Sequence, residues 1–178
     1  MPPESRLGAQ LGEAATALRR IDARYAPIGG LALAPHNVVR ATQDVELLID
    51  ADKSEAVDAE LVRLGYRCIH RTSEAGNYLR GDERIDLLYA RRPIARQLLA
   101  GAAELSTSLG TLHVIISEGL IGFKLQGFVN DARRTQDLED SRALLRANRG
   151  RMDLAEVRGY FELFDRGALL DDLLREAA

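Results

Sequence analysis

The sequence of 178 residues lacks tryptophan, and it has only five tyrosines and four phenylalanines. So few aromatic side chains give no stacking platform of the kind that binds single-stranded nucleic acid. Cysteine is nearly absent too, because Cys68 is the only one. A lone thiol forms no disulfide within the chain, so a reducing cytoplasm is the expected compartment.

Long apolar runs are also missing from the sequence. No stretch approaches the roughly 20 apolar residues of a spanning helix, and the first residues lack the basic-then-apolar order of a signal peptide. The formal net charge of −3 argues against a surface that binds polyanions as a whole. We therefore expect a cytoplasmic protein without a membrane partner.

The spacing of apolar residues predicts an α+β domain followed by a helical bundle. Helical spacing is expected over residues 5–25, 31–37, 53–65 and 93–102, and strands over 25–30, 44–50, 66–71, 77–80, 83–90 and 112–117. Beyond these, the pattern is helical over 118–129, 135–148, 153–164 and 168–177. The sequence thus predicts an α/β core over residues 1–116 and a C-terminal helical region over 117–178, packed on that core.

Two carboxylates interrupt the apolar strand "DVELLID". Residues i and i+2 of a strand point to the same face, so Asp44 and Glu46 project together while Val45, Leu47 and Ile49 form the opposite, apolar face. Like charges side by side repel, and their burial is costly unless a cation lies between them. A hard divalent cation such as Mg²⁺ meets this need. The alternative is an edge strand whose polar face meets water.

Two further features favour the metal interpretation. Asp86 interrupts another apolar strand, "RIDLLYA", in the same way. Gly29 and Gly30 stand at the end of a strand just before a helical turn, where backbone N–H groups can approach a phosphate closely. Glycine pairs are also common in ordinary turns, so the pair alone is weak evidence.

The segment "GGLALAPHNVVRATQDVELLI", followed later by "IDLLYA", resembles the nucleotidyltransferase superfamily. More narrowly it resembles the AbiEii-like and related stand-alone bacterial nucleotidyltransferases of toxin–antitoxin type. In that pattern a glycine pair opens a short helix, an acid-x-acid strand follows, often behind R-x-T, and a later strand supplies a third acid. The matching positions here are Gly29, Gly30, Arg40, Thr42, Asp44, Glu46 and Asp86.

The resemblance extends to the helical region. "LIGFKLQGFVNDARRTQDLEDSRALL" is similar to the family's lysine-containing helix followed by a D-x-x-D helix, here Lys124, Asp137 and Asp140. It implies that Lys124 takes part in catalysis and, with Asp137, contacts the nucleotide. The residues leave another interpretation open: Lys124 snorkels from an apolar helix face, and the two acids complement the dipole at a helix start.

The implied fold is a nucleotidyltransferase-like mixed sheet flanked by helices, with a C-terminal helical bundle. The implied reaction moves a nucleoside monophosphate from an NTP to an acceptor hydroxyl. Two Mg²⁺ ions, or Mn²⁺ in their place, would be held by Asp44, Glu46 and Asp86. Gly29, Gly30, Arg40 and Thr42 would bind the nucleotide. The acceptor could be RNA or tRNA, a protein or a small molecule, and a cognate antitoxin or a second copy of the chain could be a partner.

Two departures from the family pattern keep alternatives open. Glu46 stands where the family more often has aspartate, and Pro35 lies in "APHN" where many relatives have a histidine-glycine step. A catalytically degenerate binding or regulatory module is therefore one alternative. The other is an enzyme that modifies small hydroxylated compounds of the antibiotic type.

Overall fold

The computed structural model describes residues 5–107 and 110–177. These residues divide into two compact units. The sheet unit contains the described residues up to Ala32 together with Ala41–Ile115, and the helical unit contains Leu33–Arg40 and the described residues from Ile116 onward. The sequence pattern does not predict that residues 33–40 belong with the helices. The expected packing of the helical region on the core stays a prediction.

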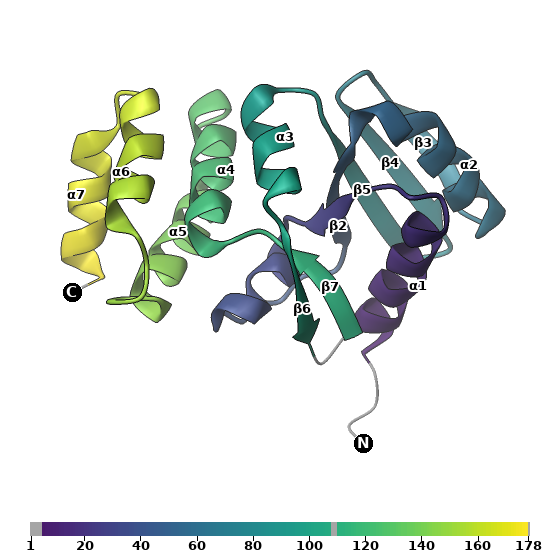
Figure 1. Cartoon of the computed structure of the whole chain (residues 1–178), viewed down its shortest axis with the longest axis horizontal. Helices are drawn as coiled ribbons and strands as arrows, with labels where there is room; N and C mark the ends of the chain where they lie inside the picture. Colours follow the sequence, from purple (N-terminus) through teal and green to yellow (C-terminus); the bar gives the residue numbers. More distant parts are fainter. Residues whose placement is uncertain (1–4, 108–109, 178) are drawn as a thin grey trace. The chain divides into compact units, whose positions relative to one another are not determined.

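A five-stranded mixed sheet forms the centre of the sheet unit (Figure 1). The strand order is β1 (Tyr25–Pro27), β2 (Val45–Asp50), β5 (Glu83–Ala90), β4 (Ala75–Arg80) and β3 (Arg67–Arg71). β2 and β5 run parallel to each other, and the other neighbouring pairs are antiparallel. The expected α+β class with a mixed sheet is confirmed.

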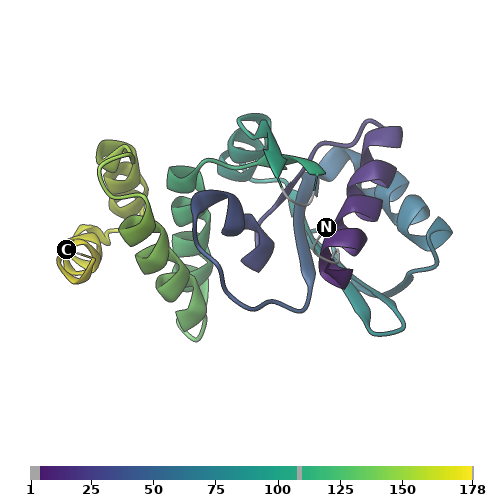
Figure 2. The same ribbon diagram turned by 90° about the horizontal axis from the view of Figure 1, so that it is seen from below.

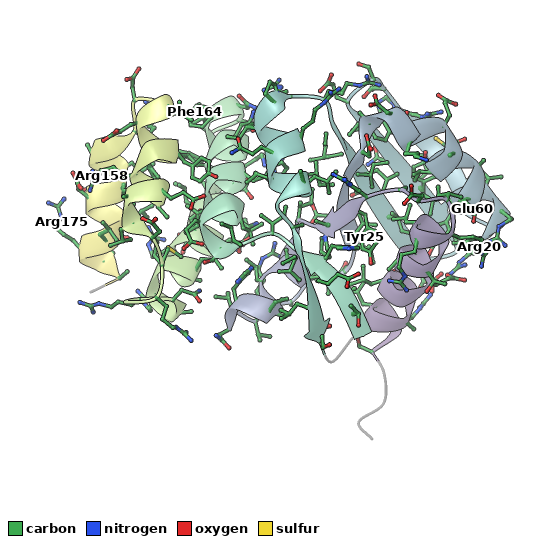
Figure 3. The ribbon with its side chains drawn as sticks, in the orientation of Figure 1. Arg20, Tyr25, Glu60, Arg158, Phe164 and Arg175 are labelled. Atoms are coloured by element: carbon green, nitrogen blue, oxygen red, sulfur yellow. The ribbon has the colours of Figure 1, made fainter. Side chains whose placement is uncertain are left out.

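Two helices cover one face of this sheet. α1 (Arg6–Arg20) and α2 (Ser54–Arg63) lie beside each other on the same side of the strands (Figures 1 and 2). The side chain of Ser5 caps α1 by accepting a hydrogen bond from the Gly8 N–H. Arg20 of α1 and Glu60 of α2 form an ion pair of 3.9 Å between the two helices (Figure 3).

The core between helices and sheet follows from strict alternation along the two central strands. Val45, Leu47 and Ile49 of β2 are at most 1% exposed, and Ile85 and Leu87 of β5 are equally buried. They pack with apolar residues of α1 and α2 in one cluster. Each such side chain contributes about 1.5–3 kcal/mol of transfer free energy. Because neighbouring residues alternate between faces, Glu46 and Asp86 must lie on the other face.

The remaining elements of the sheet unit are short. They are the 3₁₀ helices η1 (Gly30–Ala32) and η3 (Ala51–Lys53), the helix α3 (Pro93–Ala100) and the hairpin strands β6 (Ala103–Thr107) and β7 (Gly110–Val114). β6 was not predicted, because it is short, its residues are largely exposed, and Leu105 is its only large apolar side chain. β4 begins at Ala75, two residues before the strand expected over 77–80, so part of the expected turn "SEAGN" is strand.

The helical unit contains the four helices that the sequence predicts, and the 3₁₀ helix η2 (Ala34–His36) joins them. Their bounds are α4 (Ser117–Asn130), α5 (Thr135–Ala147), α6 (Leu154–Leu163) and α7 (Gly167–Glu176). Leu144, Phe161 and Leu170 are fully buried within it. On the outer side, Arg158 of α6 pairs with Asp171 of α7 at 2.7 Å (Figure 3). In the described part of the chain, no helix has both the length and the apolar character needed to cross a membrane.

Candidate functional site

Three polar residues form a row across the central strands of the sheet unit. Glu46 of β2 and Asp86 of β5 are direct register partners on parallel strands, and Asn77 of β4 is the partner of Asp86 on its other side. Neighbouring strands are about 4.8 Å apart, so the backbone places the two acids next to each other. The expected strand over 44–50 included Asp44. In the structure β2 begins at Val45, so Asp44 lies one residue before the strand.

The glycine pair lies against two other residues of the expected site. A Cβ atom at Gly29 would come within 1.7 Å of Glu46 Oε2, and one at Gly30 would come within 2.7 Å of the Thr42 Cβ. The space that each glycine leaves is therefore filled by a neighbouring side chain. The structure thus brings together Gly29, Gly30, Thr42 and Glu46, which the sequence had linked only by resemblance.

Asp86 has two partners that are not among the predicted site residues. Arg84 Nε donates to both carboxylate oxygens, at 2.9 and 3.0 Å, and Asn77 Nδ2 donates to Oδ1 at 2.6 Å. Arg84 could have been found from its spacing, since it precedes Asp86 by two residues and shares its strand face. Asn77 could not, because the strand expected over residues 77–80 carries no information on which residue of β5 it pairs with.

The charge of Arg84 acts on the whole group of acids. Its pKa is raised, first by the hydrogen bond to Asp86 and then by the charge of that carboxylate; burial acts to lower it, and the charges of Asp44 and Glu46 make the smallest contributions. The ion pair is open to water, with 46% of the Arg84 side chain and 25% of the Asp86 side chain exposed. Arg84 is thus electrostatically coupled to all three expected metal ligands.

The three acids suit a divalent metal by their chemistry. Carboxylate oxygens are the hard ligands that Mg²⁺ prefers, and Glu46 and Asp86 start from adjacent backbone positions. Across residues 5–107 and 110–177, however, no three acid, histidine or cysteine side chains converge closely enough to hold a metal ion. The contacts give the reason: the Glu46 carboxylate lies against Gly29, and Asp86 is turned to Arg84 and Asn77.

The other expected residues meet inside the helical unit. Lys124 of α4 is only 4% exposed, and its Nζ donates to Asp140 Oδ2 of α5 at 2.7 Å. Arg40 binds the same carboxylate, with its Nε 2.9 Å from Oδ1. Gln136 Nε2 donates to Oδ1 as well, at 3.0 Å. A buried aspartate is thereby held by two cations and one amide.

Asp137 belongs to the same buried group. One of its oxygens is 3.7 Å from Lys124 Nζ, and the other accepts a 2.7 Å hydrogen bond from Arg134 Nε. It lies in the first turn of α5, where an acid also complements the helix dipole. Gly127 of α4 makes room for it, because a Cβ there would come within 2.7 Å of Asp137 Oδ2.

The pKa of Asp140 is lower than its ordinary value. Burial acts to raise this pKa, but the hydrogen bonds from Arg40 and Lys124, the charge of Lys124 and the hydrogen bond from Gln136 together outweigh burial. The carboxylate therefore stays ionised in the folded protein at neutral pH, and the buried lysine keeps its counter-ion.

The expected site residues thus fall into two groups. Gly29, Gly30, Thr42, Asp44, Glu46 and Asp86 lie in the sheet unit, and Arg40, Lys124, Asp137 and Asp140 lie in the helical unit. The first group is partly open to water and carries acids on adjacent strands, which suits cation and phosphate binding. The second group is a closed network of ion pairs, which suits the packing of α4 on α5.

Comparison with known proteins gives a clear result for the fold. No family model and no curated protein sequence matches the chain. The solution structure of the antibiotic-resistance factor ANT(2'')-Ia is similar, with a TM-score of 0.72 and 16% identity over 95% of this chain and 97% of that chain.

Two crystal structures agree with that result. ANT(2'')-Ia in complex with adenylyl-2''-tobramycin gives a TM-score of 0.69 at 15% identity, over 90% of this chain and 98% of that one. The lincosamide antibiotic adenylyltransferase LnuA in its lincomycin-bound form gives 0.55 at 12% identity, over 76% of this chain and 96% of that one. The chain therefore has a nucleotidyltransferase-like fold, with a mixed sheet flanked by helices and further helices at the C-terminal end.

Proposed function

We propose that this protein is a metal-dependent nucleotidyltransferase that moves a nucleoside monophosphate from an NTP to an acceptor hydroxyl. The observation that carries the proposal is the register pairing of Glu46 with Asp86 on the parallel central strands, with Gly29 packed against Glu46. The Glu46 carboxylate thus lies against the glycine backbone, and Asp86 starts from the adjacent strand. A metal-bound triphosphate needs both features at one place.

Each residue of the sheet-unit group has a role in this proposal. The backbone at Gly29 and Gly30 binds the triphosphate, and Thr42 packs on Gly30 to hold that backbone in place. Asp44, Glu46 and Asp86 hold Mg²⁺, which when bound neutralises phosphate charge and activates the attacking oxygen. Asp86 also accepts the proton of the acceptor hydroxyl, and Asn77 orients its carboxylate.

Arg40, Lys124 and Asp137 have a weaker claim to contact the nucleotide. That role comes from the sequence resemblance alone and stays a prediction. Their mutual ion pairs and the burial of Lys124 support the structural interpretation of this group. Because an ammonium group already held by two buried carboxylates is costly to move, we assign Lys124 to the stability of the helical unit.

For the acceptor we propose a small hydroxylated molecule of the antibiotic type. The support is that ANT(2'')-Ia, solved with an adenylylated tobramycin, and the lincosamide adenylyltransferase LnuA are alike in fold and are more than nine-tenths covered by this chain. Transfer to tRNA or protein, and a toxin–antitoxin role with AbiEii-like relatives, rest on the sequence resemblance only. A degenerate binding module is the second candidate, favoured by Glu46 and by the Arg84 guanidinium on Asp86.

Label transfer tests the proposal. The full chain is incubated with Mg²⁺ and each α-labelled NTP in turn, with separate samples that contain aminoglycosides, lincosamides, total tRNA or cell lysate. We expect label on a small molecule and release of pyrophosphate. Label on tRNA or on a protein would support the proposed nucleotidyl transfer and contradict the proposed small-molecule acceptor. No transfer, combined with no binding of Mg-NTP, would contradict the enzyme and leave the binding module.

A further inference from the structure

Arg84 lies among the acids of the sheet unit and engages one of them directly. Its Nε donates to both oxygens of Asp86, and Asn77 donates to Oδ1. A carboxylate offers about four lone-pair positions for hydrogen bonds. Three of these positions on Asp86 are used by the protein itself, and one on Oδ2 is left for another ligand.

A metal ion on Asp86 would lie next to the guanidinium. Two cations on one carboxylate repel each other strongly when only a few ångströms separate them. The charges of Asp44 and Glu46 already act on Arg84 as well, so a divalent ion bound there would compete for the same negative potential. The guanidinium and a metal ion therefore compete for Asp86 in this arrangement.

We propose that Arg84 is the resident counter-ion of Asp86 and competes with the metal ion for this carboxylate, so that metal binding requires the guanidinium to leave. The inference rests on the proposed function. Release is easy, because the Arg84 side chain is 46% exposed and a solvated ion pair contributes little free energy. Asn77 remains as the positioning residue, since its amide carries no charge and occupies only Oδ1. Arg84 thus weakens metal binding to the nucleotide-free protein.

Binding of Mn²⁺ to the full chain, followed by electron paramagnetic resonance without nucleotide, tests the proposal. Arg84→Gln removes the charge, and we expect Mn²⁺ to bind about two- to fivefold more tightly, the range set by a water-exposed ion pair. Arg84→Lys keeps a charge and should remain within about twofold of wild type. Arg133→Gln is the matched control, because Arg133 also binds an aspartate two residues away, Asp131 at 2.9 Å, but in the helical unit.

The outcomes separate the inference from the proposed function. Tighter Mn²⁺ binding by Arg84→Gln that disappears when Asp86→Asn is added would support the competition. Equal or weaker binding by Arg84→Gln would overturn it, while the proposed function survives if wild type binds Mn²⁺ with NTP and Asp86→Asn weakens that binding. Absence of Mn²⁺ binding by every variant, even with NTP, would overturn both.

Discussion

Two of the ion pairs between a basic side chain and an aspartate lie in different surroundings. In the helical unit, Lys124 and Asp140 are 2.7 Å apart and each side chain is 3% exposed. In the sheet unit, Arg84 and Asp86 are 2.9 Å apart, with side chains 46% and 25% exposed. Distance alone would rank the two pairs as equals. Burial separates them, because a buried charge that loses its partner cannot turn to water.

The difference explains why we assign the two groups different tasks. A closed network in which Arg40, Lys124 and Gln136 all bind Asp140 holds α4 and α5 together and resists exchange. In the water-exposed pair, a metal ion can replace the Arg84 guanidinium on Asp86. The sequence pattern had placed residues of both groups in one nucleotide site, since it records residue types and order but not exposure to water.

Removal of the buried cation should have the largest effect. Lys124→Met leaves Asp140 and Asp137 short of positive charge, and we expect the free energy of unfolding of the helical unit to fall by about 3–5 kcal/mol. Hydrogen exchange of the amides of α4 and α5 measures this. Lys53→Met is the control; it loses one hydrogen bond to the Ile21 carbonyl and should cost about 1 kcal/mol. Unchanged exchange with lost label transfer would instead favour the nucleotide role of Lys124.

The glycine pair allows a finer test within the sheet unit. Gly30→Ala places a Cβ 2.7 Å from the Thr42 Cβ, which is fixed to the backbone, so we expect a loss of about 1–3 kcal/mol in stability. Gly29→Ala meets the end of the flexible Glu46 side chain, which can move. It should therefore lower label transfer more than stability.

We compare the two glycine variants by their thermal stability and by their rate of label transfer. Gly12→Ala in α1 is the control, because no atom lies within 4 Å of the added Cβ and alanine favours the helix by about 0.5–1 kcal/mol. If Gly29→Ala lost stability as Gly30→Ala does and kept its transfer rate, the packing of Gly29 against Glu46 would be structural only.

The smallest effect is expected from pH. The pKa of Asp140 is lower in the folded protein than in the unfolded chain, so its ionised form contributes stability above the unfolded value. That contribution is lost as the pH falls through the folded value, below about pH 4. In this range the free energy of unfolding should fall more steeply with decreasing pH for wild type than for Asp140→Asn. If the free energy of unfolding depended on pH equally in both proteins, Asp140 would not be the group that titrates.

Much of the fold could be predicted because the local signals agree with it. The alternation of Val45, Leu47 and Ile49 fixed both the strand and its buried face, and four periodic segments gave the four C-terminal helices. β6 gave no such signal, because its residues are exposed. The placement of residues 33–40 with the helices depends on distant contacts such as Arg40 to Asp140, which no local pattern reveals.

The candidate site could be predicted in composition but not in arrangement. The acids and glycines were identified from their spacing and resemblance. Asn77 was placed in a predicted strand whose pairing partner was unknown, and Arg84 was overlooked beside Asp86 although the two share a strand face. The role of Lys124 could not be predicted either, because only the three-dimensional structure shows that this side chain is buried in a network of ion pairs.

The central claim is that the acids of the sheet unit perform nucleotidyl transfer. It is tested most directly by the transfer rate of Asp86→Asn, measured with the NTP and acceptor that give the most label. Loss of a residue that hydrogen-bonds to a metal ligand typically lowers metal affinity or activity by about 10–100-fold. Loss of a direct ligand should therefore lower the transfer rate by about 100-fold or more. Asp82→Asn, on the same hairpin and 74% exposed, should leave it unchanged. Full activity in folded Asp86→Asn would contradict the account.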